Sequence, residues 1–78
     1  MVTVWRLFDQ AGVPSECTMS EHDGRWHLVV QRGRTIFLAE RCATDDAALE
    51  RSTEIWQVLK RQGWTEPVSL SPGVNRNA

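Results

Sequence analysis

Apolar and polar residues alternate along the first half of the chain, and this alternation predicts β-strands. Four segments carry the pattern: residues 2–8, 16–21, 25–31 and 34–41. Asp23-Gly24 lies between two of them and is a pair typical of a two-residue hairpin loop. Arg32-Gly33 is the second expected tight turn. The pattern therefore predicts an antiparallel sheet of three to four strands.

Residues 45–62 change to the period of an α-helix. Thr44 is a suitable N-cap, Gly63 suits the left-handed position after the last turn, and Trp64 would pack back onto that turn. At 100° per residue one stripe runs along the helix: Ala48, Leu49, Ser52, Ile55, Trp56 and Leu59. We therefore expect an α+β fold in β-β-β-β-α order, with one C-terminal amphipathic helix packed on one face of the sheet.

The length of 78 residues allows one domain with one core, which we assign to residues 1–65. From residue 66 the pattern is lost, and residues 66–78 contain two serines, two prolines, two asparagines and one glycine. This composition predicts a disordered C-terminal tail.

Two-residue loops at both tight turns would set the strand registers, with Cys17 opposite Val30 and Leu28 opposite Phe37. The side facing the helix would then carry seven residues: Cys17, Met19, Trp26, Leu28, Val30, Phe37 and Ala39. The other side would carry six: Thr18, Ser20, His27, Val29, Ile36 and Leu38. Arg25 would lie opposite Glu40 as a cross-strand ion pair. A register different by one residue would exchange the two faces.

The uncovered sheet face is the feature that points to function, because it should be polar and is not. Val29, Ile36 and Leu38 would lie there in adjacent strands beside His27. The first strand would add one of two pairs: Trp5 and Leu7, or Val4 and Phe8. A contiguous apolar patch is typical of an interface, although scattered apolar residues or a covering tail would also account for it. We expect this face to bind another protein or a second copy of the chain, as a homodimer.

Charge and cysteine content restrict the partners and the compartment. The net charge of −1 and the pI near 6.1 provide no attraction to nucleic acid or acidic lipid. Two cysteines do not form a disulfide framework, and the sequence has neither a signal-peptide pattern nor an apolar run of about 20 residues. We expect a cytoplasmic protein with reduced thiols and no membrane partner.

The soft metal ligands of the chain are Cys17, His22, His27 and Cys42. Their spacing, C-x4-H-x4-H-x14-C, differs from the close-set pairs of structural zinc sites. In the expected register Cys17 and His27 point to opposite faces, so they cannot act as a nucleophile and its base. The glycines are isolated and form no phosphate loop. We expect no metal, no cofactor and no enzymatic activity.

Asp23-Gly24-Arg25-Trp26, the strands that follow, and the helix start Thr44-x-x-x-Ala48 are similar to small bacterial proteins of unknown function with a D-G-x-W hairpin. Residues 23–56 also loosely resemble the three-stranded sheet plus helix of plant ethylene-response-factor domains and of phage integrase arm domains. The latter resemblances imply that the sheet face opposite the helix enters the DNA major groove through arginine and lysine side chains.

At the sheet rim, the residues for such a nucleic-acid interface would be Arg25, Arg32 and Arg34. Because the uncovered face is expected to be apolar, nucleic-acid binding is the alternative function and ranks below protein binding. The leading expectation is a non-catalytic bacterial accessory protein that binds through its sheet face.

Overall fold

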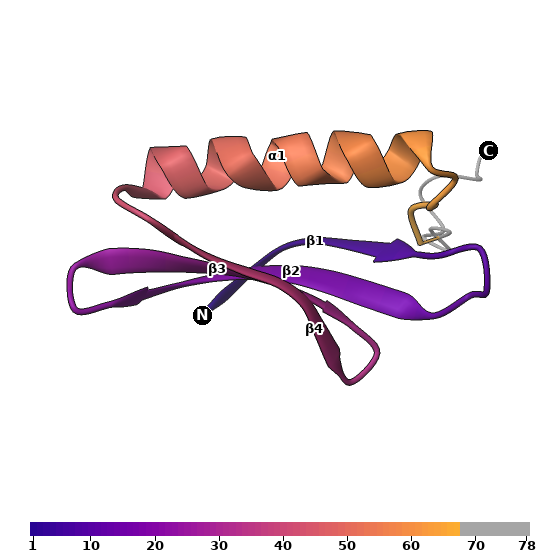
Figure 1. The fold of residues 1–78 in the computed structure, drawn as a ribbon, viewed down its shortest axis with the longest axis horizontal. Coiled ribbons are helices and arrows are strands. Elements are labelled where there is room, and N and C mark those ends of the chain that lie inside the picture. Colours follow the sequence, from indigo (N-terminus) through magenta and orange to yellow (C-terminus); the bar gives the residue numbers. More distant parts are fainter. Residues whose placement is uncertain (68–78) are drawn as a thin grey trace, which may run out of the picture.

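The computed structural model describes residues 1–67, which form a four-stranded antiparallel sheet followed by one helix (Figure 1). The elements are β1 (Val2–Phe8), β2 (Pro14–His22), β3 (Arg25–Arg32), β4 (Thr35–Cys42) and α1 (Asp45–Arg61). Strand order in the sheet is β1-β2-β3-β4, so every strand pairs with its neighbours in sequence. The α+β fold expected from the sequence is confirmed. Of the expected disordered tail, residues 68–78 lie outside the described part.

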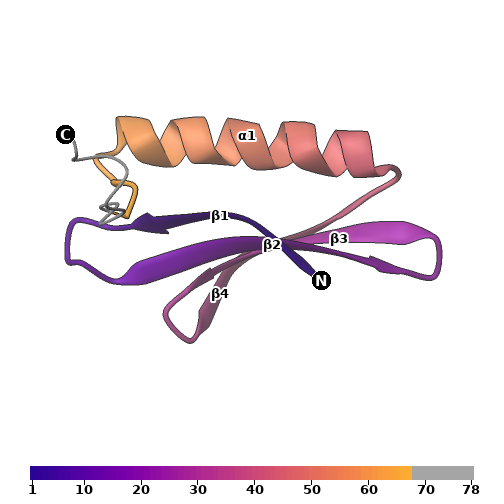
Figure 2. The ribbon, with the colours of Figure 1, turned by 180° about the vertical axis from the view of Figure 1, so that it is seen from behind.

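Helix α1 lies along one face of a strongly twisted sheet, and the β3–β4 hairpin bends away from it (Figures 1 and 2). We call the sheet face opposite α1 the outer face. Trp5 ties the helix to β1, because its indole Nε1 donates a hydrogen bond of 3.0 Å to the Ser52 carbonyl oxygen. Within residues 1–67 no helix combines the length and apolar character needed to cross a membrane.

The ends of α1 form as their sequence predicts. The Thr44 hydroxyl accepts a hydrogen bond of 3.0 Å from the Ala47 N–H, which satisfies one of the free donors of the first turn. Gly63 has a φ of 94°. The N–H of Trp64 donates to the Leu59 carbonyl at 3.0 Å, the bond that defines a Schellman C-cap.

The core lies between α1 and the sheet and takes its side chains from both. Its buried apolar members are Leu7, Cys17, Met19, Leu28, Val30, Ala48, Ile55 and Leu59. The apolar stripe on the helix is narrower than expected, because Leu49 is 45% exposed and Trp56 is only partly buried. The question left open for β1 is also answered: Trp5 and Leu7 face the helix, so Phe8 lies on the outer face.

The β2–β3 register agrees with the prediction, with His22 opposite Arg25 and Cys17 opposite Val30. Asp23 and Gly24 form the two-residue loop and have φ values of 53° and 74°. Positive φ at both loop positions is the signature of a type I′ turn, whose twist matches that of the two strands.

The predicted β3–β4 register is wrong at two points. The loop consists of Gly33-Arg34 instead of Arg32-Gly33, because Arg32 pairs with Thr35. Gly33, with a φ of 59°, takes the first loop position, as in a type II′ turn. The register then shifts between Val30 and Gln31, and Phe37 is the additional residue on β4, as in a β-bulge.

Together, the two changes exchange the faces to which the side chains of β4 beyond the bulge point. Leu28 lies opposite Glu40 instead of Phe37, and Trp26 lies opposite Cys42 instead of Ala39. Glu40 thus faces α1, and the predicted Arg25–Glu40 ion pair does not form. Phe37, expected in the core, is 52% exposed. A displacement by an odd number of residues exchanges the faces of a strand, which is why one bulge has this effect.

Candidate functional site

The structure keeps three residues of the predicted patch on the outer face and removes the fourth. Leu38 points to the face of the sheet that α1 covers, where it packs against the core. Val29 and His27 lie half-buried on the outer face, and Ile36 is 62% exposed near the β3–β4 turn. Because the bulge at Phe37 removes Leu38 from the outer face, that face carries fewer apolar residues than the sequence predicted.

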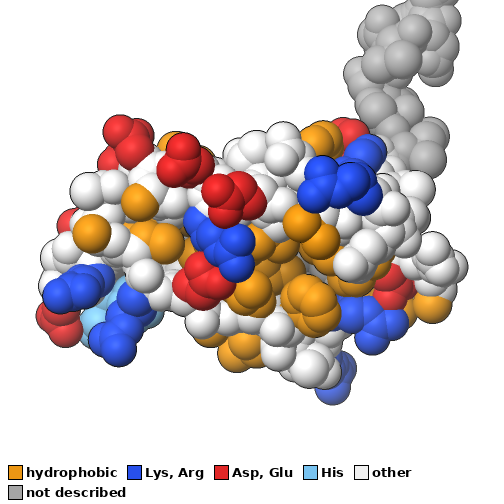
Figure 3. All heavy atoms as spheres, turned by 45° about the horizontal axis from the view of Figure 1, so that its top comes forward, with side chains coloured by type: hydrophobic (Ala, Val, Ile, Leu, Met, Phe, Trp, Pro, Cys, Tyr) orange, Lys and Arg blue, Asp and Glu red, His pale blue; other side chains and the backbone are white. Residues whose placement is uncertain are grey.

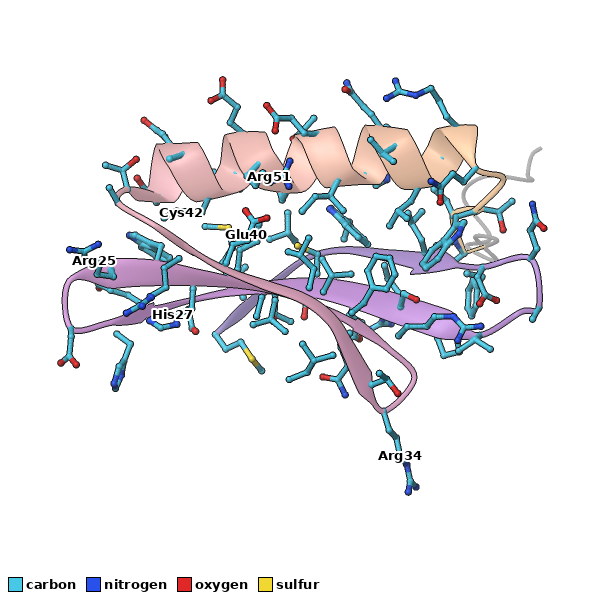
Figure 4. All side chains as sticks on the ribbon, viewed as in Figure 1. Arg25, His27, Arg34, Glu40, Cys42 and Arg51 are labelled. Carbon is cyan, nitrogen blue, oxygen red and sulfur yellow. The ribbon has the colours of Figure 1, made fainter. Side chains whose placement is uncertain are left out.

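The three arginines predicted for a nucleic-acid interface are separated. Arg25 lies at the β2–β3 hairpin, and Arg34 lies at the tip of the β3–β4 hairpin (Figure 4). Arg32 forms an ion pair with Asp9, with its Nε 2.6 Å from the carboxylate Oδ2. These three residues therefore do not form one surface.

Asp9 anchors the β1–β2 loop. Its carboxylate accepts hydrogen bonds from the Val13 N–H at 2.8 Å and the Ala11 N–H at 2.9 Å, in addition to Arg32. The bond from Val13, together with Arg32 and Ala11, lowers the pKa of Asp9 below its usual value despite some desolvation. The residue joins the loop to β3 and has a structural role.

Glu40 and Arg51 join β4 to α1. The Arg51 guanidinium donates from Nε to Glu40 Oε1 at 2.9 Å and from Nη2 to Oε2 at 3.0 Å, which is a bidentate pair. Arg51 also donates to Glu54 at 3.2 Å. The hydrogen bonds from Arg51 hold the pKa of Glu40 below its usual value. Figure 4 shows the pair between the helix and the sheet.

The edge of β4 carries the most exposed apolar residues of the sheet outside the N-terminus. Ile36 is 62% exposed, and the Phe37 ring, 52% exposed, lies 6.0 Å from the Trp64 ring between centroids. Val58, 42% exposed, follows Arg51 by two helical turns and so lies on the flank of α1 nearest β4. Hydrophobic side chains gather between α1 and this edge in Figure 3. We call Ile36, Phe37 and Val58 the β4 edge patch.

The two edges of the sheet differ in how they are covered. On the free side of β1, Phe8 and Thr65 exchange two backbone hydrogen bonds of 2.7 and 2.8 Å. No strand within residues 1–67 pairs with the free side of β4. The backbone N–H and C=O groups on that side are therefore available to another strand.

A second surface lies on the outer face at the β2–β3 hairpin. Four basic side chains and one acidic side chain line a hollow of about 450 Å³ there: His22, Asp23, Arg25, His27 and Arg41. We call it the basic hollow. Sequence reasoning missed Arg41, because the predicted register placed it toward the helix. The Gly33-Arg34 loop would not by itself have revealed Arg41, because it moves the register by two residues and keeps the faces of β4. The bulge at Phe37 turns Arg41 outward, and a bulge has no comparable short-range sequence signal.

The side chains with nucleophilic or ligand chemistry are dispersed. Burial raises the pKa of the Cys17 thiol to about 12, and Cys42 is half-buried and also free. In the part of the chain that the structure describes, no group of three or more His, Cys, Asp or Glu side chains could hold a metal ion.

Comparison of the chain with protein-family profiles, with curated proteins and with solved structures finds no match.

Proposed function

We propose that this chain is a non-catalytic protein-interaction module that associates through the free edge of β4, with a second copy of the chain as its partner. The observation that supports the proposal is the combination of an unpaired strand edge with three exposed apolar side chains beside it. As part of the same proposal, the protein is a bacterial accessory protein that works in the cytoplasm. Its two free cysteines suit a reducing compartment.

An unpaired edge strand favours addition of a further strand. Soluble proteins usually protect such an edge with charge, cover or irregularity. Here the bulge at Phe37 interrupts the edge but leaves Leu38–Cys42 regular. Antiparallel pairing of two identical strands is self-complementary, so each copy would also bring its own Ile36 and Phe37 to the same interface.

The proposed residues differ from the predicted ones for a physical reason. Of the predicted set, only Ile36 belongs to the β4 edge patch, because the bulge moves Leu38 to the core side and leaves Val29 between Thr18 and Ala39. The interaction is therefore assigned to the edge of the sheet and not to its outer face.

Sedimentation velocity across the micromolar range tests the proposal. We expect the wild-type chain to sediment increasingly as a dimer as its concentration rises, and Ile36→Lys and Phe37→Lys to sediment as monomers. Leu49→Lys is the matched control, since Leu49 is 45% exposed but lies two residues before Arg51 and so on the opposite flank of α1.

A wild-type chain that stays monomeric at every concentration would overturn self-association. A loss of dimer in Leu49→Lys equal to that in Phe37→Lys would overturn the assignment to β4. Circular dichroism of each variant separates loss of association from loss of folding.

A further inference from the structure

We propose that the basic hollow binds the phosphate group of a small ligand. The hollow lies on the outer face where the β2–β3 hairpin meets the end of β4, and Figure 4 shows Arg25 and His27 together at that end of the sheet. This proposal does not depend on association through the β4 edge.

The strand registers place the four basic residues on one face in two adjacent rows. His22 lies directly opposite Arg25, and His27 lies directly opposite Arg41. The two imidazole rings contact edge to face, with centroids 5.9 Å apart. Because like charges directly opposite each other destabilise a sheet, this arrangement has an energetic cost whenever the histidines are protonated.

The positive charge of the hollow is not neutralised from within the described chain. Arg6, Arg32 and Arg51 each pair with a carboxylate. In contrast, neither Arg25 nor Arg41 forms an ion pair with any residue from 1 to 67, and the one acidic residue of the hollow, Asp23, contacts His22 at 3.5 Å.

The carboxylate next to Arg41 in the sequence, Glu40, is turned away from the hollow. Glu40 precedes Arg41 on β4 but points to the opposite face, where Arg51 holds it. Because the side chains of β4 beyond the bulge have exchanged faces, an arginine instead of a glutamate lies on the outer face. A bound anion would supply the missing negative charge.

Phosphate is the anion that best matches these donors. Arginine presents a planar fork that matches phosphate geometry, and histidine adds further N–H donors. The volume of about 450 Å³ is within the range of small-molecule sites. Since the whole chain carries a net charge of −1, the local positive charge favours one compact anion over a polyanion that would also meet the acidic surface.

The test is a 15N–1H NMR titration of the full chain with sodium phosphate, at constant ionic strength maintained with sodium chloride. We expect saturable shifts confined to amides near residues 22–27 and 41. Arg25→Gln and Arg41→Gln should each weaken binding about tenfold, the usual effect of losing one charge-assisted contact. Arg34→Gln is the matched control, because Arg34 is an exposed arginine at the other hairpin tip. Its affinity should equal that of the wild type.

A second arm uses sulfate, whose charge does not change over the range used, in place of phosphate. Histidine gains its charge between about pH 8 and pH 5, so sulfate should bind more tightly at the lower end of that range. The ionisable groups facing the hollow are His22, Asp23, Arg25, His27 and Arg41. His27→Gln should reduce this increase in sulfate affinity at lower pH.

Three results would overturn the proposal. If chloride alone reproduces the shifts, or if Arg34→Gln weakens binding as much as Arg25→Gln, the ion is adventitious only. If a short single-stranded oligonucleotide shifts amides along the whole outer face, and binds far more tightly than phosphate, the surface is a nucleic-acid interface instead. Unchanged amide spectra outside the hollow establish that the variants remain folded.

Discussion

At the scale of single residues, buried position and hydrogen bonding decide which side chains are chemically active. Cys17 is fully buried, and desolvation raises its thiol pKa from 9.0 to about 12. Asp9 and Glu40 accept charge-assisted hydrogen bonds and are held ionised. These contacts of Asp9 and Glu40 join separate elements of the fold.

The two thiols should differ in reactivity. A pKa of about 12 leaves Cys17 with about a thousandfold less thiolate than a thiol at 9.0, and burial excludes the reagent. We expect one thiol of the native protein to react quickly with a disulfide reagent and the second only on unfolding. Cys42→Ser should remove the fast reaction, and Cys17→Ser should leave it. Equal native rates for the two cysteines would contradict the buried position of Cys17.

The lowered carboxyl pKa values predict the direction of acid unfolding. Because the folded pKa of Asp9 and of Glu40 lies below its unfolded value, each stabilises the fold above the unfolded pKa. That contribution is lost as the pH falls through the folded pKa. The urea midpoint should thus be flat above about pH 5 and fall below about pH 4.

Substitution identifies the groups responsible for this acid dependence. Asp9→Asn and Glu40→Gln should each lower the urea midpoint at neutral pH and make its acid dependence shallower. For Glu40→Gln the loss should be about 1 kcal/mol, because the ion pair is partly exposed. Glu21→Gln, an exposed position on β2, is the control and should keep the wild-type slope. A wild-type slope in both test variants would show that neither carboxylate controls acid stability.

At the scale of elements, the turns and caps that short-range sequence signals predict form in the structure, except at the β3–β4 connection. The Asp23-Gly24 loop, the Thr44 N-cap and the Gly63 C-cap all form where local chemistry predicts them. The β3–β4 connection differs because its loop begins one residue later and a bulge follows. A bulge has no short-range sequence signal comparable to an Asp-Gly pair.

The type I′ turn gives a prediction that separates backbone strain from packing. A Cβ added at Gly24 would meet no atom within 4 Å, so Gly24→Ala affects only the left-handed backbone at φ 74°. We expect a loss of about 1 kcal/mol in the free energy of unfolding, measured by urea denaturation. Asp23→Asn should be neutral or slightly stabilising, since asparagine is favoured there. No loss in Gly24→Ala would mean that another turn type is present.

At the scale of the whole molecule, a single helix covers one face of the sheet and leaves β4 as an open edge. A domain of about 60–70 residues buries only about 60% of the surface that its unfolded chain exposes, less than a larger domain does, so its stability margin is narrow. Association at β4 would add to that margin. The melting temperature of the wild type should therefore rise with protein concentration, while that of Phe37→Lys stays constant.

The two proposed surfaces depend on the same feature of the tertiary structure. The bulge at Phe37 exposes that side chain at the edge, and it also turns Arg41 onto the outer face and Glu40 toward α1. Neither surface could be derived from the predicted register. The predicted register contained no bulge, and for that reason alone it assigned the predicted interaction residues Val29 and Leu38 to the same face.

The amino-acid sequence by itself determined the order of elements, the helix with its caps, the type I′ hairpin and the buried face of β2 and β3. These features depend on short-range rules: positive φ at glycine, hydroxyl capping and the periods of helix and strand. Only the tertiary structure decided which face of β4 meets the helix. That choice is made by packing of Leu38 against the core and by the Glu40–Arg51 pair, contacts between residues distant in sequence. Because one extra residue exchanges the faces of a strand, these long-range contacts decided where both candidate surfaces lie.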